Sequence, residues 1–159
     1  MLVLDASSAL HAWDNYPVEQ FPSLWNWIER QIAIGELTIP WVALEEVGHK
    51  YPECAAWLKA SKIGVNAMTQ AMLTDALRIK DLLEIAGDAY GKGVDENDLF
   101  IIATACALDA ELLTDEKRQP SRDKFKKNYK IPAVCDLPEV KVRSLNFVEY
   151  FKRSQEVFG

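Results

Sequence analysis

Short apolar runs alternate with longer segments of helical spacing along the whole chain. The first run, residues 2–5 (LVLD), is apolar until its final acid, as in a parallel strand covered on both faces. Further strands are predicted within residues 36–40 (ELTIP), 111–116 (ELLTDE) and 142–145 (VRSL), and 62–68 (KIGVNAM) is compatible with another. We therefore expect a sheet of about four to five strands.

Helices are predicted between these strands, where apolar residues recur at a 3.6-residue period. The expected helices cover residues 23–34, 41–50, 54–61, 69–86, 95–110 and 146–158, and a first helix is capped by Ser7 or Ser8. Residues 117–130 are expected to be a loop, and 130–140 to be irregular. This order of elements sets the expected fold class.

Strands that alternate with helices predict an α/β fold, a three-layer α/β/α sandwich with a mostly parallel central sheet. No internal repeat, low-complexity segment or linker interrupts the 159 residues. We therefore expect one domain over residues 1–159, with a core supplied by the 49% hydrophobic content.

Composition and charge argue against several classes of protein. The net charge of −6 gives no general affinity for nucleic acid, although a local basic patch can still provide it. The three cysteines lack CxxC spacing and suit buried, reduced thiols, and two histidines make a Cys/His zinc site an unfavoured interpretation. No targeting segment is visible, and the apolar stretch 99–108 is far shorter than the roughly 20 residues that span a bilayer. We expect a cytoplasmic protein without membrane contact.

Acidic residues mark the predicted ends of two strands and the start of one helix. Asp5 ends the first strand, Asp115 and Glu116 end the strand ELLT, and Asp98 starts a helix with Asp95 one turn earlier. In a parallel sheet the ligand crevice lies beyond the carboxyl ends of the strands. Carboxylates gathered there repel one another unless a hard cation such as Mg²⁺ or Mn²⁺ joins them. Because such ions activate water for attack on phosphoryl groups, the pattern favours metal-assisted phosphodiester chemistry.

Each acid also has a purely structural interpretation. Asp5 and Asp98 are suitable helix caps, Glu45 and Glu46 suit a solvated helix face, and the acids at 115–116 suit a turn. The combination of these acids favours a metal site more strongly than any single one.

Four segments carry a resemblance to a known family. They are residues 1–10 (MLVLDASSAL), 37–47 (LTIPWVALEEV), 97–117 (NDLFIIATACALDAELLTDEK) and 130–151 (KIPAVCDLPEVKVRSLNFVEYF). Together they resemble the PIN-domain family over nearly the whole chain, and the last segment resembles an uncharacterised PIN-like subgroup. The most specific part is an Asp that heads an alanine-rich helix, followed by a strand that ends in Thr-x-acid.

The resemblance also suggests which residues form the site. The family's metal-binding and catalytic acids fall on Asp5, Glu46, Asp98 and Glu116. Possible supporting residues are Asp95, Asp115, Ser7, Thr114 and Glu45. Glu116 departs from the commoner pattern, which has Asp at that place, so either its longer side chain reaches the ion or Asp115 takes the role.

A Mg²⁺- or Mn²⁺-dependent endoribonuclease that hydrolyses RNA is the function that the resemblance implies. Many small PIN proteins are toxins that an antitoxin protein holds inactive, and they often form homodimers. One alternative is a non-catalytic PIN-like module that binds RNA or protein. Another, phosphoryl transfer at Asp5, is disfavoured because aspartyl phosphatases need a second Asp two residues later, where Ser7 stands.

A basic segment follows Glu116 directly. Its cationic residues are Lys117, Arg118, Arg122, Lys124, Lys126, Lys127 and Lys130, which are seven of the 18 in the chain. Local charge of this kind suits phosphate contacts, and all but Lys130 are taken as the RNA-binding set. The alternatives are a solubilising loop or a surface that docks an antitoxin. Phe125 and Tyr129 suit either stacking on bases or packing in the core.

Trp25 and Trp27 lie two residues apart on one predicted helix. Residues at this spacing do not share a helix face. We therefore expect one of them to lie in an interface, and the helix around Trp25 or the one around Met72 is the expected dimer or antitoxin surface.

Overall fold

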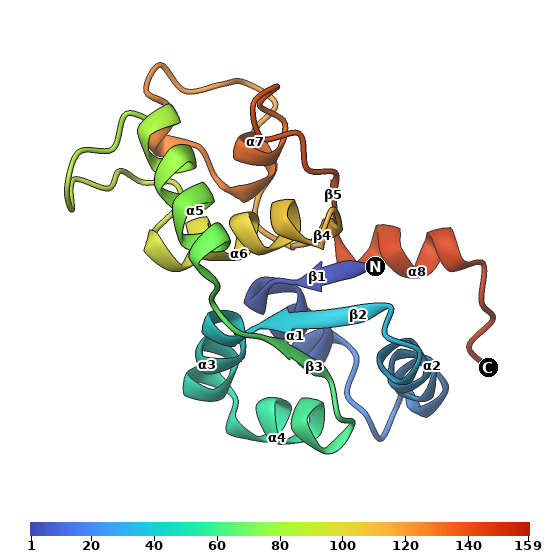
Figure 1. The fold of residues 1–159 in the computed structure, drawn as a ribbon. Coiled ribbons are helices and arrows are strands. Elements are labelled where there is room, and N and C mark those ends of the chain that lie inside the picture. Colours follow the sequence, from blue (N-terminus) through green and yellow to red (C-terminus); the bar gives the residue numbers. More distant parts are fainter.

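A five-stranded sheet in the order β3-β2-β1-β4-β5 forms the centre of the computed structural model, which describes residues 1–159 (Figure 1). Its strands are β1 (Leu2–Leu4), β2 (Leu37–Pro40), β3 (Gly64–Asn66), β4 (Glu111–Leu113) and β5 (Ser144–Leu145). All the strand pairs are parallel, and Val3 of β1 lies opposite both Thr38 and Leu112. The predicted parallel sheet is confirmed.

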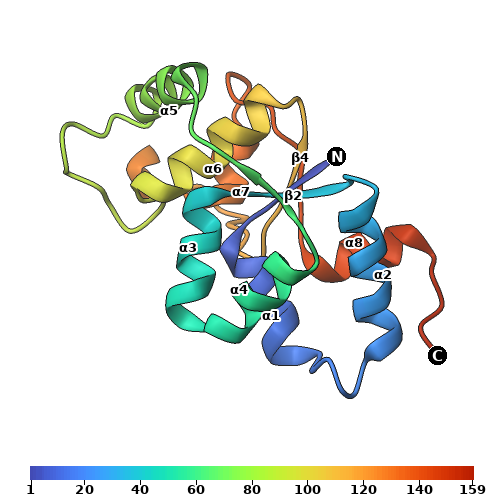
Figure 2. The ribbon, with the colours of Figure 1, turned by 60° about the horizontal axis from the view of Figure 1, so that its bottom comes forward.

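Helices cover both faces of this sheet, which confirms the predicted three-layer sandwich. They are α1 (Ala6–Asn15), α2 (Pro22–Ala33), α3 (Trp41–Lys50), α4 (Pro52–Ala60), α5 (Gln70–Leu82), α6 (Glu96–Ala107), α7 (Ile131–Cys135) and α8 (Phe147–Ser154), with a 3₁₀ turn η1 (Lys126–Asn128). Helix α6 lies against β1, β2 and β4 and contacts α5 and α7, while α1, α2, α4 and α8 lie on the other side (Figure 1, Figure 2). Helix α3 begins where β2 ends and contacts both α1 and α6.

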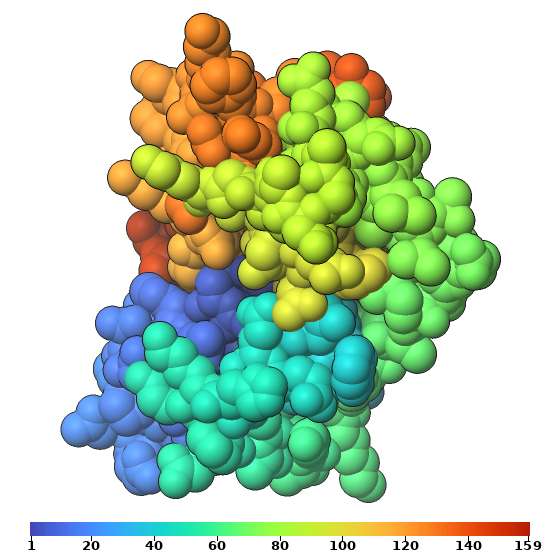
Figure 3. Space-filling view, turned by 90° about the vertical axis from the view of Figure 1, so that its left-hand side faces the viewer, coloured from blue at the N-terminus to red at the C-terminus, as the bar shows by residue number.

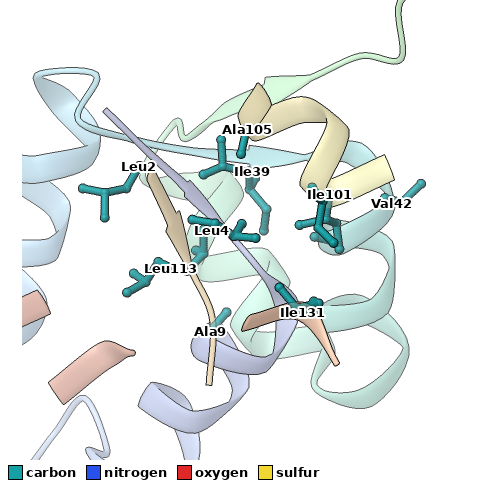
Figure 4. Close-up of a cluster of buried hydrophobic side chains, with 14 of the residues drawn as sticks. Leu2, Leu4, Ala9, Ile39, Val42, Ile101, Ala105, Leu113 and Ile131 are labelled. Carbon is teal, nitrogen blue, oxygen red and sulfur yellow. The ribbon is translucent and has the colours of Figure 1, made fainter. Parts of the chain in front are cut away.

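The hydrophobic core extends over both faces of the sheet. Leu4 and Leu113 are buried on adjacent strands and line one hollow with residues of α1 and α2, while Ile101 and Ala105 of α6 are also buried (Figure 4). Residues 101–105 are all buried, because α6 is enclosed between the sheet and the outer helices α5 and α7. This enclosure explains why α6 is apolar on every side and rich in small residues, rather than amphipathic.

Several local predictions are wrong. Residues 131–135, expected to be irregular, form the buried helix α7, with Pro132 in its first turn, where proline needs no hydrogen-bond partner. Ser7 and Ser8 do not cap α1 but lie inside its first turn, and Asp5 occupies the N-cap position. The helix expected to reach residue 86 ends at Leu82.

Both tryptophans of α2 are buried, so the expectation that one of them is exposed at an interface is wrong. The exposed fractions are 4% for Trp25 and 2% for Trp27. Helix α2 is covered from two sides: the ring of Trp25 lies 4.8 Å from that of Trp57, and the ring of Trp27 lies 4.9 Å from that of Tyr150. Two non-adjacent faces of one helix are therefore used for packing.

The three cysteines are free, with Cys54 and Cys135 buried and Cys106 half-buried. Among the helices, none has the length and apolar character needed to cross a membrane.

Candidate active site

The predicted acids meet at the end of the sheet where the parallel strands finish. Asp5 follows β1 directly, and Glu116 lies three residues after β4. Glu46 is carried by α3, and Asp98 lies in the first turn of α6. Figure 3 views this end of the molecule, with residues 117–130 (orange) and the loop before α6 (yellow-green) above α1 (blue) and α3 (cyan). We call Asp5, Glu46, Asp98 and Glu116 the acid cluster.

Asp5 is the most deeply buried member of the acid cluster, with an exposed fraction of 2%. Its backbone occupies the N-cap position of α1, but its side chain makes no capping hydrogen bond. Instead, Oδ2 accepts hydrogen bonds from the hydroxyls of Ser7 and, at 2.9 Å, Thr114. The capping interpretation therefore fails for this side chain, and its carboxylate is held in place by two hydroxyls with no cation nearby.

Glu45 and Glu46 face different surroundings although they are adjacent in α3. Glu45 is exposed, whereas Glu46 is half-buried and its Oε1 accepts a hydrogen bond of 3.1 Å from Nδ2 of Asn97. This bond joins α3 to the first turn of α6. The sequence analysis did not identify Asn97 as a site residue. Its position between Asp95 and Asp98 is the feature of the sequence that could have indicated it.

Asp95 and Asp98 form a reciprocal capping box at the start of α6. The N–H of Asp98 donates to Oδ1 of Asp95 at 2.9 Å, and the N–H of Asp95 donates to Oδ2 of Asp98 at 3.0 Å. Asp95, rather than Asp98, is therefore the N-cap residue. The hydrogen bond to Oδ2 fixes the orientation of the Asp98 carboxylate, and Oδ1 takes no part in the capping box.

The side chains of Asp115 and Glu116 have different partners. Asp115 Oδ2 accepts hydrogen bonds from Ser8 Oγ at 2.6 Å and from the N–H of Phe147 at 3.2 Å, so this carboxylate joins α1 to α8. Glu116 instead lies 3.6 Å from Nζ of Lys130 and is held by a backbone hydrogen bond to Thr114 Oγ1. Of the two candidates, Glu116 is the one whose charge acts on the other acids of the cluster.

The pKa values of the buried acids are raised. Burial raises the pKa of Asp5 to about 6, against the lowering effect of the Ser7 and Thr114 hydrogen bonds, and Glu116 and Glu46 raise it further. Burial also raises the pKa of Asp98 well above its ordinary range, and Asp95, Asp5 and Glu116 add to the effect. The pKa of Glu46 is raised by burial, with Asp95 and Glu116 contributing. Burial and the charges of neighbouring acids therefore disfavour the ionised form of these three carboxyl groups.

The donor set of the acid cluster fits a hard divalent cation. All its donors are carboxylate oxygens, with hydroxyls beside them, which suits Mg²⁺ or Mn²⁺ better than a softer metal. No three acidic, His or Cys side chains form a group that could by itself hold a metal ion. Mg²⁺ usually keeps several waters and takes only one or two carboxylates directly, so the acid cluster would hold a hydrated ion through few direct ligands.

The basic segment is attached to the loop that precedes α6. The N–H of Val94 donates to the carbonyl of Tyr129 at 2.9 Å, and the N–H of Lys92 donates to Oδ1 of Asn128 at 2.9 Å. A Cβ at Gly93 would come within 2.1 Å of the Tyr129 carbonyl oxygen, so the contact requires glycine. Backbone contacts with the loop before α6 therefore fix the end of the basic segment near the acid cluster.

The predicted RNA-binding residues fall into two groups. Arg118 is ion-paired with Glu149 at 2.7 Å and Arg122 with Asp136 at 2.9 Å, and both arginines line a cavity of about 560 Å³. The second group has no ion pair and consists of Lys117, Lys124, Lys126 and Lys127. Phe125 is 53% exposed, whereas Tyr129 is buried in the core.

Comparisons with known proteins agree with this architecture. The profile of the family described as "Domain of unknown function (DUF4411)" matches residues 2–158. No curated protein matches the chain. A chain of the structure titled "Crystal structure of VapBC2 from Rickettsia felis bound to a DNA fragment from their promoter" is similar, with a TM-score of 0.58, 17% identity, and coverage of 92% of this chain and 98% of that chain. At this identity the likeness concerns the fold, and the predicted PIN-like fold is confirmed.

Proposed function

The chain belongs to the family described as a domain of unknown function, DUF4411, and we propose that it is a divalent-metal-dependent ribonuclease. The observation that carries the proposal is the largely uncompensated charge of the acid cluster, in which only Glu116 has an ion-pair partner. The pKa values of Asp5, Glu46 and Asp98 are raised, first by burial and then by the charges of neighbouring acids. This arrangement costs folding stability, and an added cation would relieve it.

In the proposed site the acid cluster holds Mg²⁺ or Mn²⁺ through carboxylate oxygens. When bound, such an ion supplies Lewis-acid activation of the phosphodiester and a hydroxide-like nucleophile at neutral pH. The neighbouring residues keep the carboxylates oriented: Ser7 and Thr114 hold Asp5, and Asn97 holds Glu46. Asp95 fixes Asp98 in the same way through the capping box.

RNA is the proposed substrate because cationic side chains lie beside the acid cluster. Phosphate contacts need local positive charge even on an acidic protein. Lys117 and Lys126 have no ion pair to break, and Lys124 and Lys127 lie over the ring of Phe125. Arg118 and Arg122 would first have to leave Glu149 and Asp136. The exposed ring of Phe125 suits stacking on a base.

A toxin that an antitoxin protein holds inactive is the proposed biological role. It is supported by the likeness in fold to a chain from the VapBC2 structure, whose title describes that pair bound to a fragment of its promoter. The earlier prediction of a homodimer stays a prediction.

Two neighbouring glutamates provide the test. We expect Mg²⁺- or Mn²⁺-dependent cleavage of RNA, lost by at least about 100-fold in Glu46→Gln, since even residues that only support metal ligands change activity by 10–100-fold. Glu45→Gln, on the exposed face of the same helix, should cleave as the wild type does. Equal activity in the two variants would contradict the assignment.

A second candidate function is a non-catalytic PIN-like module that binds RNA or protein. The observation in its favour is that the acids do not form a closed ligand group and that Glu116 already has a cationic partner. Calorimetry distinguishes the two functions, because a folded chain that releases no heat with Mn²⁺ and cleaves no RNA favours the binding module.

A further inference from the structure

Lys130 is the one basic residue within ion-pair distance of the acid cluster. Its Nζ lies 3.6 Å from Oε2 of Glu116, and neither Asp5, Glu46 nor Asp98 has such a partner. The two side chains are 35% and 30% exposed, so water screens the pair only in part. The acid cluster therefore contains a cation supplied by the chain itself.

The backbone of Lys130 is fixed on both sides. Its N–H donates to Oε1 of Gln119 at 2.8 Å, and the preceding carbonyl, of Tyr129, accepts from Val94. The residues that follow, 131–135, form α7 and are all buried. The position of Lys130 beside Glu116 thus results from packed structure rather than from a flexible surface loop, and its side chain differs in this respect from the exposed Lys124.

We propose that Lys130 competes with the divalent cation for the Glu116 carboxylate. In the metal-free protein the ammonium partly offsets the repulsion among the acids. A divalent ion that binds Glu116 must displace the ammonium, because two cations on one carboxylate repel each other. Lys130 is then a positioning residue that lowers metal affinity and leaves a free ammonium beside the acid cluster when the ion binds. This inference rests on the proposed metal site.

Mn²⁺ titrations of the full chain by calorimetry test the competition. Lys130→Met keeps most of the aliphatic stem and removes the charge, and we expect it to bind Mn²⁺ about three- to five-fold more tightly, the range that a partly screened ion pair supports. Lys130→Arg should bind as the wild type does. Lys124→Met, which removes an exposed and unpaired charge from the same segment, is the matched control for general electrostatic effects.

Thermal unfolding is a second test of the competition between Lys130 and Mn²⁺. In EDTA, Lys130→Met should unfold at a lower temperature than the wild type, and Mn²⁺ should raise its melting temperature by more. Lys130→Gln repeats both measurements with a polar side chain. Unchanged or weaker Mn²⁺ binding in folded Met and Gln variants, with normal binding in the wild type, would overturn the competition alone. Absence of Mn²⁺ binding in the wild type would overturn the metal site and this inference together.

Discussion

The two ends of the sheet carry acids in opposite circumstances. Where the strands begin, Glu111 accepts from Nη1 of Arg153 through both oxygens at 2.9 Å and lies 3.4 Å from Arg143, and Glu36 lies 3.2 Å from the N-terminal amine. Where the strands end, Asp5 is buried beside other acids with no cation partner. The acids are chemically alike, but Glu111 and Glu36 are compensated by cations, whereas in the acid cluster only Glu116 has such a partner, Lys130.

This difference separates structural acids from candidate functional ones. The hydrogen bonds to Glu111 raise the pKa of Arg153, so the folded chain favours the charged guanidinium. Asp5 and Asp98 have raised pKa values, so the fold disfavours their charge. Groups that weaken the fold are expected where function requires them. The comparison therefore predicts opposite effects of neutralising an acid at each end.

Neutralising Asp5 should give the largest change. Its pKa is raised from 3.8 to about 6, a shift of about two pH units, which corresponds to at most about 3 kcal/mol. For Asp5→Asn in EDTA at pH 7.5 we expect the free energy of unfolding to rise by up to about 3 kcal/mol, the full gain requiring that the new amide finds hydrogen-bond acceptors. Urea unfolding measures the difference.

The pH dependence checks the cause. Near pH 3 Asp5 is protonated in both the folded and the unfolded chain, so the variant should gain little. As the pH rises from 3.8 to about 6 the unfolded chain loses this proton while the folded chain keeps it, so the wild type loses stability until the curve levels above pH 6. Asp115→Asn is the control, since it removes the charge that strengthens two hydrogen bonds to Oδ2 and should destabilise. A destabilised Asp5→Asn at pH 7.5 would contradict the comparison.

A divalent cation should give the next largest effect. At a concentration about 100 times its dissociation constant, Mn²⁺ should raise the free energy of unfolding by about 2.7 kcal/mol at pH 7.5. The gain should shrink at pH 5, where Asp5 holds its proton, and should be lost in Asp5→Asn but kept in Glu45→Gln. Calorimetric melting with Mn²⁺ and with EDTA measures it, and an equal gain at both pH values would argue against binding by these acids.

Neutralising Glu111 should give the smallest effect, with the opposite sign. Glu111→Gln leaves Arg153 and Arg143 without their shared carboxylate, and we expect the free energy of unfolding to fall by about 1 kcal/mol, as for a partly exposed ion pair. RNA cleavage per folded molecule should be unchanged. A loss of cleavage in this variant would show that the two ends of the sheet are not functionally separate.

The sequence predicted local structure correctly where residues near one another in the chain stabilise it. Helix α8 begins where the sequence predicted a helix, because its cap, the box of Asn146 and Glu149, needs only residues in the same turn. Helix α7 was missed because its stability comes from burial of all five residues rather than from its own sequence. Trp25 and Trp27 were misjudged for a similar reason, since α8 and the C-terminal residues cover a face of α2 that appeared solvent-exposed.

The sequence by itself determined most of the order of strands and helices and the parallel sheet, because periodicity is a local property, and its resemblance to the PIN-domain family suggested the candidate acids. Tertiary structure decided which acids lie close enough for their charges to act on one another. It placed the start of α6 beside the strand ends, since this helix packs antiparallel to the sheet. It also turned Asp115 toward α8 and Glu116 toward Lys130. These outcomes depend on distances between elements far apart in the chain, which no local pattern encodes.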